Sequence, residues 1–494
     1  MRVSQIVSAW YVTSIIHEML FNSLTFALFL PIVFAGYWLL QKSSLRLQNA
    51  FVLFASYVFY GWWDWRFLFL ILFSSTVDYS VSRALGRTSL SGKRKALLAV
   101  SLACDLGVLC FFKYFNFFID SFSALFVSMG MRLDMPTLHI ILPVGISFYT
   151  FQSLSYTLDV YRRQVEPVDD FVAFLAFVSF FPQLVAGPIE RAGNLLPQFL
   201  VRRRFDTDKA SDGLRQALWG LFKKVVIADN LAESVDTIFS DPVAHAGSEL
   251  VLGAAYFATQ IYCDFSGYSD IAIGVARLFG FELRRNFAYP YFSRDIVEFW
   301  RRWHISLSTW FRDYVFIPLG GSHGVSKSRW LANVLATFTI SGLWHGADWK
   351  FIFWGFLNGV LYIVWPKRTV TPNSETPSGE RRLLVSMHNA CQICATFGAI
   401  LLGWVFFRAP SLSIAFQYLS SVFKGSWHSL PKTAHLLVFL ALLFPIEWLQ
   451  RDKMHPLAIS ALPRWVRWAV YYVVCSFILL TGNLHHVPFI YFQF

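Results

Sequence analysis

Long apolar stretches separated by polar or basic connections recur along almost the whole chain. They lie at residues 24–40, 49–61, 66–82, 96–112, 138–158, 171–187, 213–228, 249–280, 330–345, 349–365, 389–407, 434–449 and 465–481. A helix needs about 20 apolar residues to cross a bilayer, and some of these stretches are shorter. The pattern therefore predicts an all-α, polytopic membrane protein with about ten to thirteen transmembrane or re-entrant helices.

Three polar or irregular segments interrupt this pattern. Residues 177–199 contain three prolines and two glycines, which predicts a broken, re-entrant segment because internal proline disrupts a helix. Residues 366–382 are rich in Pro, Ser, Thr and charge, which predicts a flexible loop that divides a core at 19–365 from a C-terminal helical bundle at 383–494. Residues 1–18 read poorly as a signal peptide, and a second start-like sequence begins at Met19. We expect the working protein to begin there.

Composition agrees with a membrane protein, since 56% of the residues are hydrophobic and only 15% are charged. The net charge is +12, but the basic residues are scattered among the connections, which favours positive-inside orientation over nucleic-acid binding. The short connection with Lys42 and Arg46 and the basic loop 82–95 are then cytoplasmic, and the N-terminus lies outside.

The segment 298–321 carries the most informative pattern. Its apolar residues recur at three- and four-residue steps, which predicts one amphipathic helix at an interface or lining a funnel: Trp300, Trp303, Leu307, Trp310, Phe311 and Tyr314. His304 lies at the edge of this stripe. Arg301, Arg302 and Arg312 occupy the other face, where they either form an interfacial belt or bind phosphate oxygens.

His345 ends the apolar stretch 330–345, within the sequence SGLWHGADWKFIFWG. A lone membrane histidine is more often structural than catalytic. Here the small residues Ser341, Gly342, Gly346 and Ala347 leave room for a ligand to approach the ring. Burial keeps an imidazole uncharged, so it can act as a general base near neutral pH.

Two aspartates, Asp264 and Asp270, lie within apolar sequence. Intramembrane carboxylates are candidate functional residues, although bracing of broken helices is the more common role. Their spacing matches no metal site, and we predict none.

The chain also lacks a P-loop, a G-x-S-x-G nucleophile motif, an H-x-x-x-x-D acyltransfer box and an H-E-x-x-H zinc motif. The six cysteines sit mostly in apolar runs and suit packing.

Together these motifs resemble the membrane-bound O-acyltransferase family, in the branch of bacterial polysaccharide acetylation proteins of the alginate type. The resemblance covers nearly the whole chain from Met19 and rests on six motifs, which are FWRRWHISLSTWFRDYVFIPLGG, SGLWHGADWKFIFWG, ILPVGISFYTFQSLSY, QLVAGPIER, YCDFSGYSDIAIG and the ending FIYFQF.

The resemblance implies a helical fold around a central funnel in the bacterial inner membrane. A cytoplasmic thioester donor such as acetyl-CoA would meet an extracytoplasmic polysaccharide, which is acetylated directly or through a periplasmic partner enzyme. His345 matches the family's catalytic histidine and would act as general base. His304 matches the second polar position and would orient the donor or polarise its carbonyl. Arg301, Arg302 or Arg312 would hold the donor's phosphates.

Two alternatives stay open at this point. One is D-alanyl transfer to teichoic acid from a carrier protein, which keeps the fold and changes the cargo. The other is a transporter or flippase, where broken helices and midplane carboxylates are also found. Such transporters usually have two related halves, and this sequence shows no internal repeat.

Overall fold

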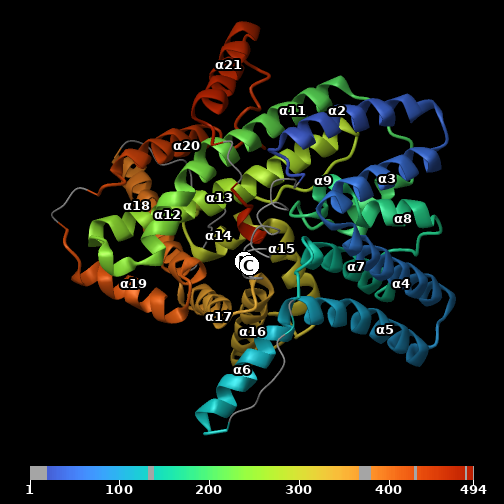
Figure 1. Cartoon of the computed structure of the whole chain (residues 1–494), viewed down its shortest axis with the longest axis horizontal. Coiled ribbons are helices and arrows are strands. Elements are labelled where there is room, and N and C mark those ends of the chain that lie inside the picture. The colour runs from blue at the N-terminus through green and yellow to red at the C-terminus, as the bar shows by residue number, and fades with distance from the viewer. Residues whose placement is uncertain are drawn as a thin grey trace, which may run out of the picture. The chain divides into compact units, whose positions relative to one another are not determined.

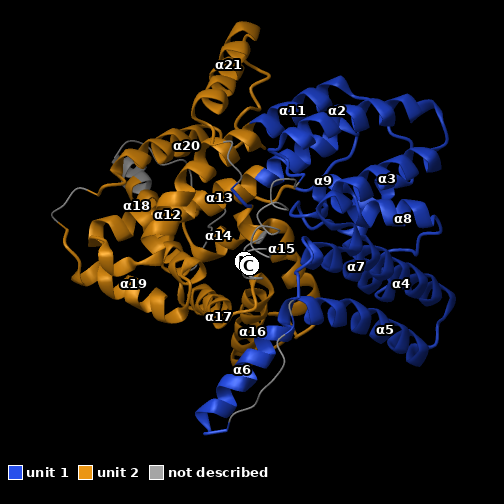
Figure 2. Cartoon of the chain, viewed as in Figure 1, with its two compact units in different colours: residues 1–218, 268–284, 484–488 blue, residues 219–267, 285–483, 489–494 orange. Residues whose placement is uncertain are grey.

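A computed structural model of the chain describes residues 19–131, 138, 140–366, 380–427, 431–483 and 487–492. These residues form helices and turns, with no strand among them, so the predicted all-α class is confirmed (Figure 1). The predicted extension 1–18 and most of the polar loop 366–382 lie outside the described residues. The chain divides into two compact units, whose boundaries fall elsewhere than at that loop (Figure 2).

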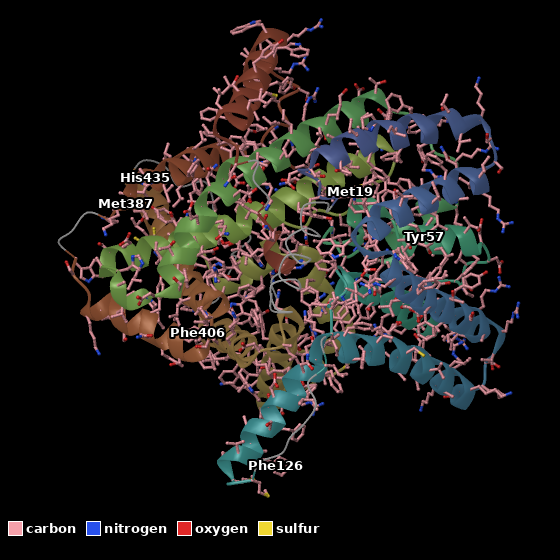
Figure 3. The ribbon with its side chains drawn as sticks, viewed as in Figure 1. Met19, Tyr57, Phe126, Met387, Phe406 and His435 are labelled. Carbon is pink, nitrogen blue, oxygen red and sulfur yellow. The ribbon has the colours of Figure 1, made fainter. Side chains whose placement is uncertain are left out.

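Unit 1 comprises residues 1–218, 268–284 and 484–488. Its helices are α2 (Leu24–Leu39), α3 (Leu45–Asp64), α4 (Leu68–Arg87), α5 (Ser91–Leu109), α6 (Phe115–Ser128), α7 (Ile146–Tyr161), α8 (Phe171–Val178), α9 (Phe181–Leu184), α10 (Ala192–Phe199) and most of α11 (Thr207–Phe222). Short 3₁₀ turns (Leu40–Lys42 and Trp65–Phe67) follow α2 and α3, and a π-helical turn (Cys110–Tyr114) joins α5 to α6. Helix α6, with Phe126 near its tip, projects from the other helices of this unit (Figure 3).

Helices α4, α5 and α7 pack against one another in unit 1, around two buried aspartates. Asp78 on α4 and Asp105 on α5 are 0% and 1% exposed. Ser101 Oγ donates to Asp78 Oδ1 at 2.5 Å, and Ser74 Oγ donates to Asp105 Oδ1 at 2.6 Å. Each carboxyl group is therefore held by a serine hydroxyl of the other helix.

Unit 2 comprises residues 219–267, 285–483 and 489–494. Its helices are α12 (Asp229–Ser240), most of α13 (Gly247–Leu278), α14 (Ile296–Arg302), α15 (Ile305–Phe311), α16 (Lys327–His345), α17 (Trp349–Val364), α18 (Glu380–Arg408), α19 (Leu412–Lys424), α20 (Leu437–Leu449) and α21 (Arg464–Thr481). Two π-helical turns, η4 (Lys223–Ala228) and η7 (Arg312–Phe316), precede α12 and follow α15. Short 3₁₀ turns lie at Pro242–Ala244, Pro290–Phe292, Ala434–Leu436 and Ile490–Phe492 (η9).

Many helices begin where a serine or aspartate accepts a hydrogen bond from the first turn, as is typical of helix N-caps. Ser326 caps α16 in this way and Asp348 caps α17. Asp348, the last residue of the W-H-G-A-D sequence, therefore serves to start a helix.

Helices α16 and α17 pack closely in unit 2 because glycines face each other at their crossing. A Cβ on Gly342 would lie 2.2 Å from Phe351 O and 3.0 Å from Gly355 Cα. A Cβ on Gly346 would lie 2.2 Å from the ring of Phe351. We had predicted that Gly342 and Gly346 leave room for a ligand, and this is wrong, because Phe351 fills the space beside both of them.

Four helical stretches of the described residues are long and apolar enough to cross a membrane: Leu24–Lys42, Leu45–Arg87, Ser91–Ser128 and Met387–Arg408. Two further apolar helices are shorter, at Trp349–Val364 and Ala434–Leu449. The predicted total of membrane segments stays a prediction, as does the central funnel.

Two local predictions have clear outcomes in unit 1. The stretch 177–199 is broken into α8, α9 and α10 by turns, as its prolines predicted. The basic loop expected at 82–95 is wrong in extent, since α4 runs to Arg87 and α5 begins at Ser91. Its basic residues mostly lie on the two helices rather than between them.

Candidate active site

His304 lies at a break between two short helices of unit 2. Helix α14 ends at Arg302 and α15 begins at Ile305, with His304 in the left-handed conformation at φ 42° and ψ 54°. The Ile305 backbone N–H donates to Asn286 O at 2.9 Å instead of continuing the helix. The single helix predicted over 298–321 is therefore wrong, although four residues of its predicted apolar stripe are buried: Trp303, Leu307, Trp310 and Phe311. This backbone conformation is uncommon and strained for a residue other than glycine. Residues that adopt it cluster at functional sites.

Asn286 fixes the tautomer of the His304 ring. Its Oδ1 accepts from the Ser306 backbone N–H at 3.3 Å and from Ser306 Oγ at 2.9 Å. A backbone N–H can only donate, so the atom facing it is an oxygen and not the amide nitrogen. His304 Nδ1 lies 3.2 Å from the same oxygen and must therefore carry the proton. Nε2 is left with a lone pair, buried and without a hydrogen-bond partner among the described residues.

The His304 ring is held neutral by its surroundings. The residue is 1% exposed, and burial lowers its pKa to about 3. Its neighbours are aromatic, with ring centroids 4.6 Å away for Phe265 and 6.2 Å away for Phe287 and Trp344. Near neutral pH, Nε2 can accept a proton or a hydrogen bond but cannot donate one.

His345 is the last residue of α16 and is 5% exposed. Four aromatic rings surround it, at centroid distances of 5.0 Å for Trp344, 5.1 Å for Trp354, 5.5 Å for Phe407 and 5.7 Å for Tyr491. Phe407 comes from α18 and Trp354 from α17, so three helices converge on this imidazole. The glycine packing of α16 on α17 sets the position of His345 at that junction.

The two histidines share two aromatic neighbours. Trp344 lies beside both rings, and the Tyr491 centroid is 6.4 Å from His304 and 5.7 Å from His345. The structure thus brings the predicted pair together from α15 and α16. Sequence reasoning did not single out Tyr491, Asn286 or Phe265. The aromatic ending FIYFQF was a signal for the first, but nothing local marks the other two.

The predicted phosphate-binding arginines differ in what they contact. Arg302 Nη2 donates to Glu298 Oε1 at 2.8 Å, and Arg312 Nε donates to Asp313 Oδ1 at 2.7 Å. Arg301 is exposed and makes no hydrogen bond or ion pair among the described residues. Of the three, Arg301 alone is available for an anion without first breaking an ion pair.

Asp264 and Asp270 connect neighbouring segments through hydrogen bonds and an ion pair. Asp264 pairs with Lys224 and accepts from the backbone of Ile490, and Asp270 accepts from Gln216 at 2.7 Å. These contacts agree with the bracing role considered from the sequence.

The chain is similar to several bacterial acyltransferases. Residues 168–407 match the membrane-bound O-acyltransferase family. The chain is 40% identical to a probable alginate O-acetylase of Azotobacter vinelandii over 414 residues, which cover 83% of this chain and 79% of that protein. It is 34% identical to a peptidoglycan O-acetyltransferase of Helicobacter pylori over 433 residues, which cover 82% of this chain and 80% of that protein.

A third relative is more distant. A teichoic acid D-alanyltransferase of Bacillus subtilis is 27% identical over 230 residues, which cover 44% of this chain and 57% of that protein. The two buried histidines thus lie in a chain that is similar to O-acetyl-transferring proteins over most of both lengths. The chain belongs to the membrane-bound O-acyltransferase family and is a multi-pass membrane O-acyltransferase.

Proposed function

We propose that this protein transfers an acetyl group from a cytoplasmic thioester, acetyl-CoA, to hydroxyl groups of a polysaccharide outside the inner membrane. The observation that carries the proposal is the meeting of His304 and His345, both buried, at Tyr491 and Trp344. A dry aromatic site favours neutral imidazole, which is the form that accepts a proton. The names of the alginate and peptidoglycan relatives support a polysaccharide acceptor.

His345 is the general base in this mechanism. Its imidazole takes the proton from an acceptor hydroxyl while the hydroxyl oxygen attacks the acetyl carbonyl carbon. The carbon–sulfur bond then breaks, and the proton held by His345 passes to the departing thiolate. General-base assistance of this kind is typically worth about 10²–10⁴-fold in rate. The acetyl group passes to the polysaccharide directly, or first to a periplasmic partner enzyme that then acetylates the polysaccharide.

His304 orients the donor in this scheme. Its Nε2 lone pair suits an amide N–H of the pantetheine arm, which can donate to it. Polarisation of the thioester carbonyl, the other role considered from the sequence, needs a donor on the ring. Asn286 favours the tautomer with the proton on Nδ1, which leaves no proton on Nε2 to donate to the thioester. Arg301, exposed and without an ion pair, is the best placed of the three arginines to meet the phosphates of coenzyme A.

Transfer measured with purified protein in lipid nanodiscs tests the proposal. Acetyl-CoA labelled in the acetyl group should label an added polysaccharide, and His345→Gln should lower the rate by at least about 10²-fold. His455→Gln is the matched control, because His455 is a histidine of unit 2 that is 1% exposed and lies between α20 and α21. Equal rates in wild type and His345→Gln would contradict the assignment. Transfer of D-alanine from a carrier protein, but not of acetyl from acetyl-CoA, would identify the competing activity.

A further inference from the structure

The last described residues of the chain, 489–492, bring Tyr491 to the two-histidine site. Tyr491 contacts both imidazole rings, and Phe265 of α13 packs on it with a centroid distance of 4.4 Å. Ile490 is buried beside it. A short terminal segment has few contacts of its own and tends to fray unless it is tied down. The question is what holds these residues in place.

A buried carboxylate ties the segment to α13. Asp264 Oδ2 accepts from the Ile490 backbone N–H at 2.7 Å. Asp264 Oδ1 forms an ion pair with Lys224 Nζ at 2.8 Å, and Lys224 Nζ forms a second ion pair with Asp229 Oδ1 at 2.8 Å. All three side chains are buried. The Lys224 ammonium therefore fixes the Asp264 carboxylate, and that carboxylate fixes the backbone of Ile490.

The chain is tied to the same region before it reaches this segment. Asn483, just beyond α21, donates its backbone N–H to Val225 O at 2.8 Å. Asn230 Nδ2 donates to Thr481 O at 2.9 Å. Val225 and Lys224 both belong to η4, whose π-helical geometry is rare and occurs frequently at functional sites. The end of α21 and the segment 489–492 are thus anchored to η4 and to its ion-pair partner.

We infer that Asp264 and Lys224 are positioning residues of the transferase, forming with Asp229 a latch that holds residues 489–492 against His304 and His345. This inference rests on the proposed function for its effect on transfer. Asp264 and Phe265 are consecutive on α13, so the carboxylate holds the backbone of Ile490 while the adjacent ring packs on both Tyr491 and His304. Loss of the carboxylate would release the segment without changing either histidine.

Three variants separate this latch from general stability. Asp264→Ala removes both the ion pair and the acceptor for Ile490. Asp264→Asn keeps an oxygen that can accept from Ile490 but loses the ion pair. Glu249→Gln is the matched control, because Glu249 is a second buried carboxylate of α13 and contacts His245 Nδ1 at 3.0 Å. It lies 15 residues before Asp264, about 22 Å away along the helix.

Hydrogen–deuterium exchange of the C-terminal peptides reports on the latch directly. We expect Asp264→Ala to speed exchange of the Ile490 amide at least about tenfold, Asp264→Asn to have an intermediate effect, and Glu249→Gln to have none. In the transfer assay, Asp264→Ala should lower kcat at least about tenfold with little change in KM for acetyl-CoA, since the donor contacts remain. If Asp264→Ala does not fold, the same comparison is made with Asp264→Asn.

Unchanged exchange in the folded Asp264 variants would overturn the latch, whatever the activity. Faster exchange with an unchanged kcat would overturn the positioning role. Wild-type protein that transfers no acetyl group would contradict the proposed function alone, and the exchange data would still decide whether Asp264 holds the segment.

Discussion

At the scale of single residues, the backbone of His304 is as informative as its ring. A non-glycine residue at φ 42° is uncommon, and the Cβ of an L-residue in the left-handed region costs about 1–2 kcal/mol. The conformation ends α14, starts α15 and turns the imidazole towards Phe265 and Trp344. The protein therefore has a strained backbone at His304, the residue that matches the second polar position of the family's motif.

This strain can be measured by replacing His304 with glycine and with alanine. Both variants lose the ring, but only alanine keeps a Cβ in the left-handed region. We expect His304→Ala to unfold more easily than His304→Gly by about 1 kcal/mol, because glycine carries no penalty there. Thermal unfolding in the same detergent checks the difference. Equal stability of the two variants would contradict the strained conformation.

The neutral state of His304 also predicts a pH dependence of stability. Its pKa is lowered by burial to about 3, whereas histidine in an unfolded chain titrates near about 6.5. Between these values the unfolded chain binds a proton that the folded protein excludes, so the free energy of unfolding decreases as the pH falls.

We therefore expect the unfolding temperature to drop between about pH 6.5 and about pH 4, and His304→Gln to reduce that drop. His435→Gln, at an exposed histidine, is the control and should leave the wild-type slope unchanged. A slope that is the same in wild type and in His304→Gln would show that the ring is not excluded from protonation.

At the scale of helices, the site depends on close packing of α16 on α17. A Cβ on Gly355 would lie 2.3 Å from Phe338 O and 2.9 Å from Gly342 Cα. Both neighbours are backbone atoms, which cannot rotate away as a flexible side chain can. The two helices would have to separate, and the imidazole of His345 at the end of α16 would move with them.

Gly355→Ala should therefore lower the free energy of unfolding by about 1–3 kcal/mol, as overpacking does. It should also lower transfer, because the end of α16 carries His345. The control is Gly398→Ala on α18, where no described atom lies within 4 Å of the added Cβ. Alanine is the better helix former by about 1 kcal/mol, so this variant should be as stable as wild type or more stable. Similar losses in both variants would argue against the packing explanation.

At the scale of the whole molecule, the distribution of charge predicts orientation in the membrane. The turn between α4 and α5 is flanked by Arg83, Arg87, Lys93, Arg94 and Lys95, which favours a cytoplasmic position. Ser89 is exposed in this turn. In intact cells, Ser89→Cys should be protected from a membrane-impermeant maleimide that does not enter the cytoplasm, and should become labelled in inverted vesicles. Labelling of intact cells at this position would reverse the orientation.

Hydrophobic patterning predicted most of the helices but not where they break. The expected stretches 330–345 and 349–365 correspond to α16 and α17, which begin and end within a few residues of them. The break at His304 and the π-helical turn of η4 were missed. At the break, the Ile305 N–H bonds to Asn286 O, 19 residues earlier in the chain, and no local pattern encodes that contact.

The sequence pointed to the two histidines of the candidate site but not to the residues that surround them. His304 and His345 stood out because an ionisable ring within aromatic sequence is unusual, and both rings are indeed buried. Asn286, Phe265 and Tyr491 reach them from segments far apart in the chain, so only the fold reveals these partners. Asp78 and Asp105 escaped notice likewise, since each looks isolated in its own apolar stretch.

The serine–aspartate bonds between α4 and α5 have a consequence for how this hairpin tolerates change. Ser101 Oγ donates to Asp78 and Ser74 Oγ donates to Asp105, and a buried acceptor that loses its donor costs about 1–3 kcal/mol. Neither serine can therefore be exchanged for alanine without weakening the contact between the two helices.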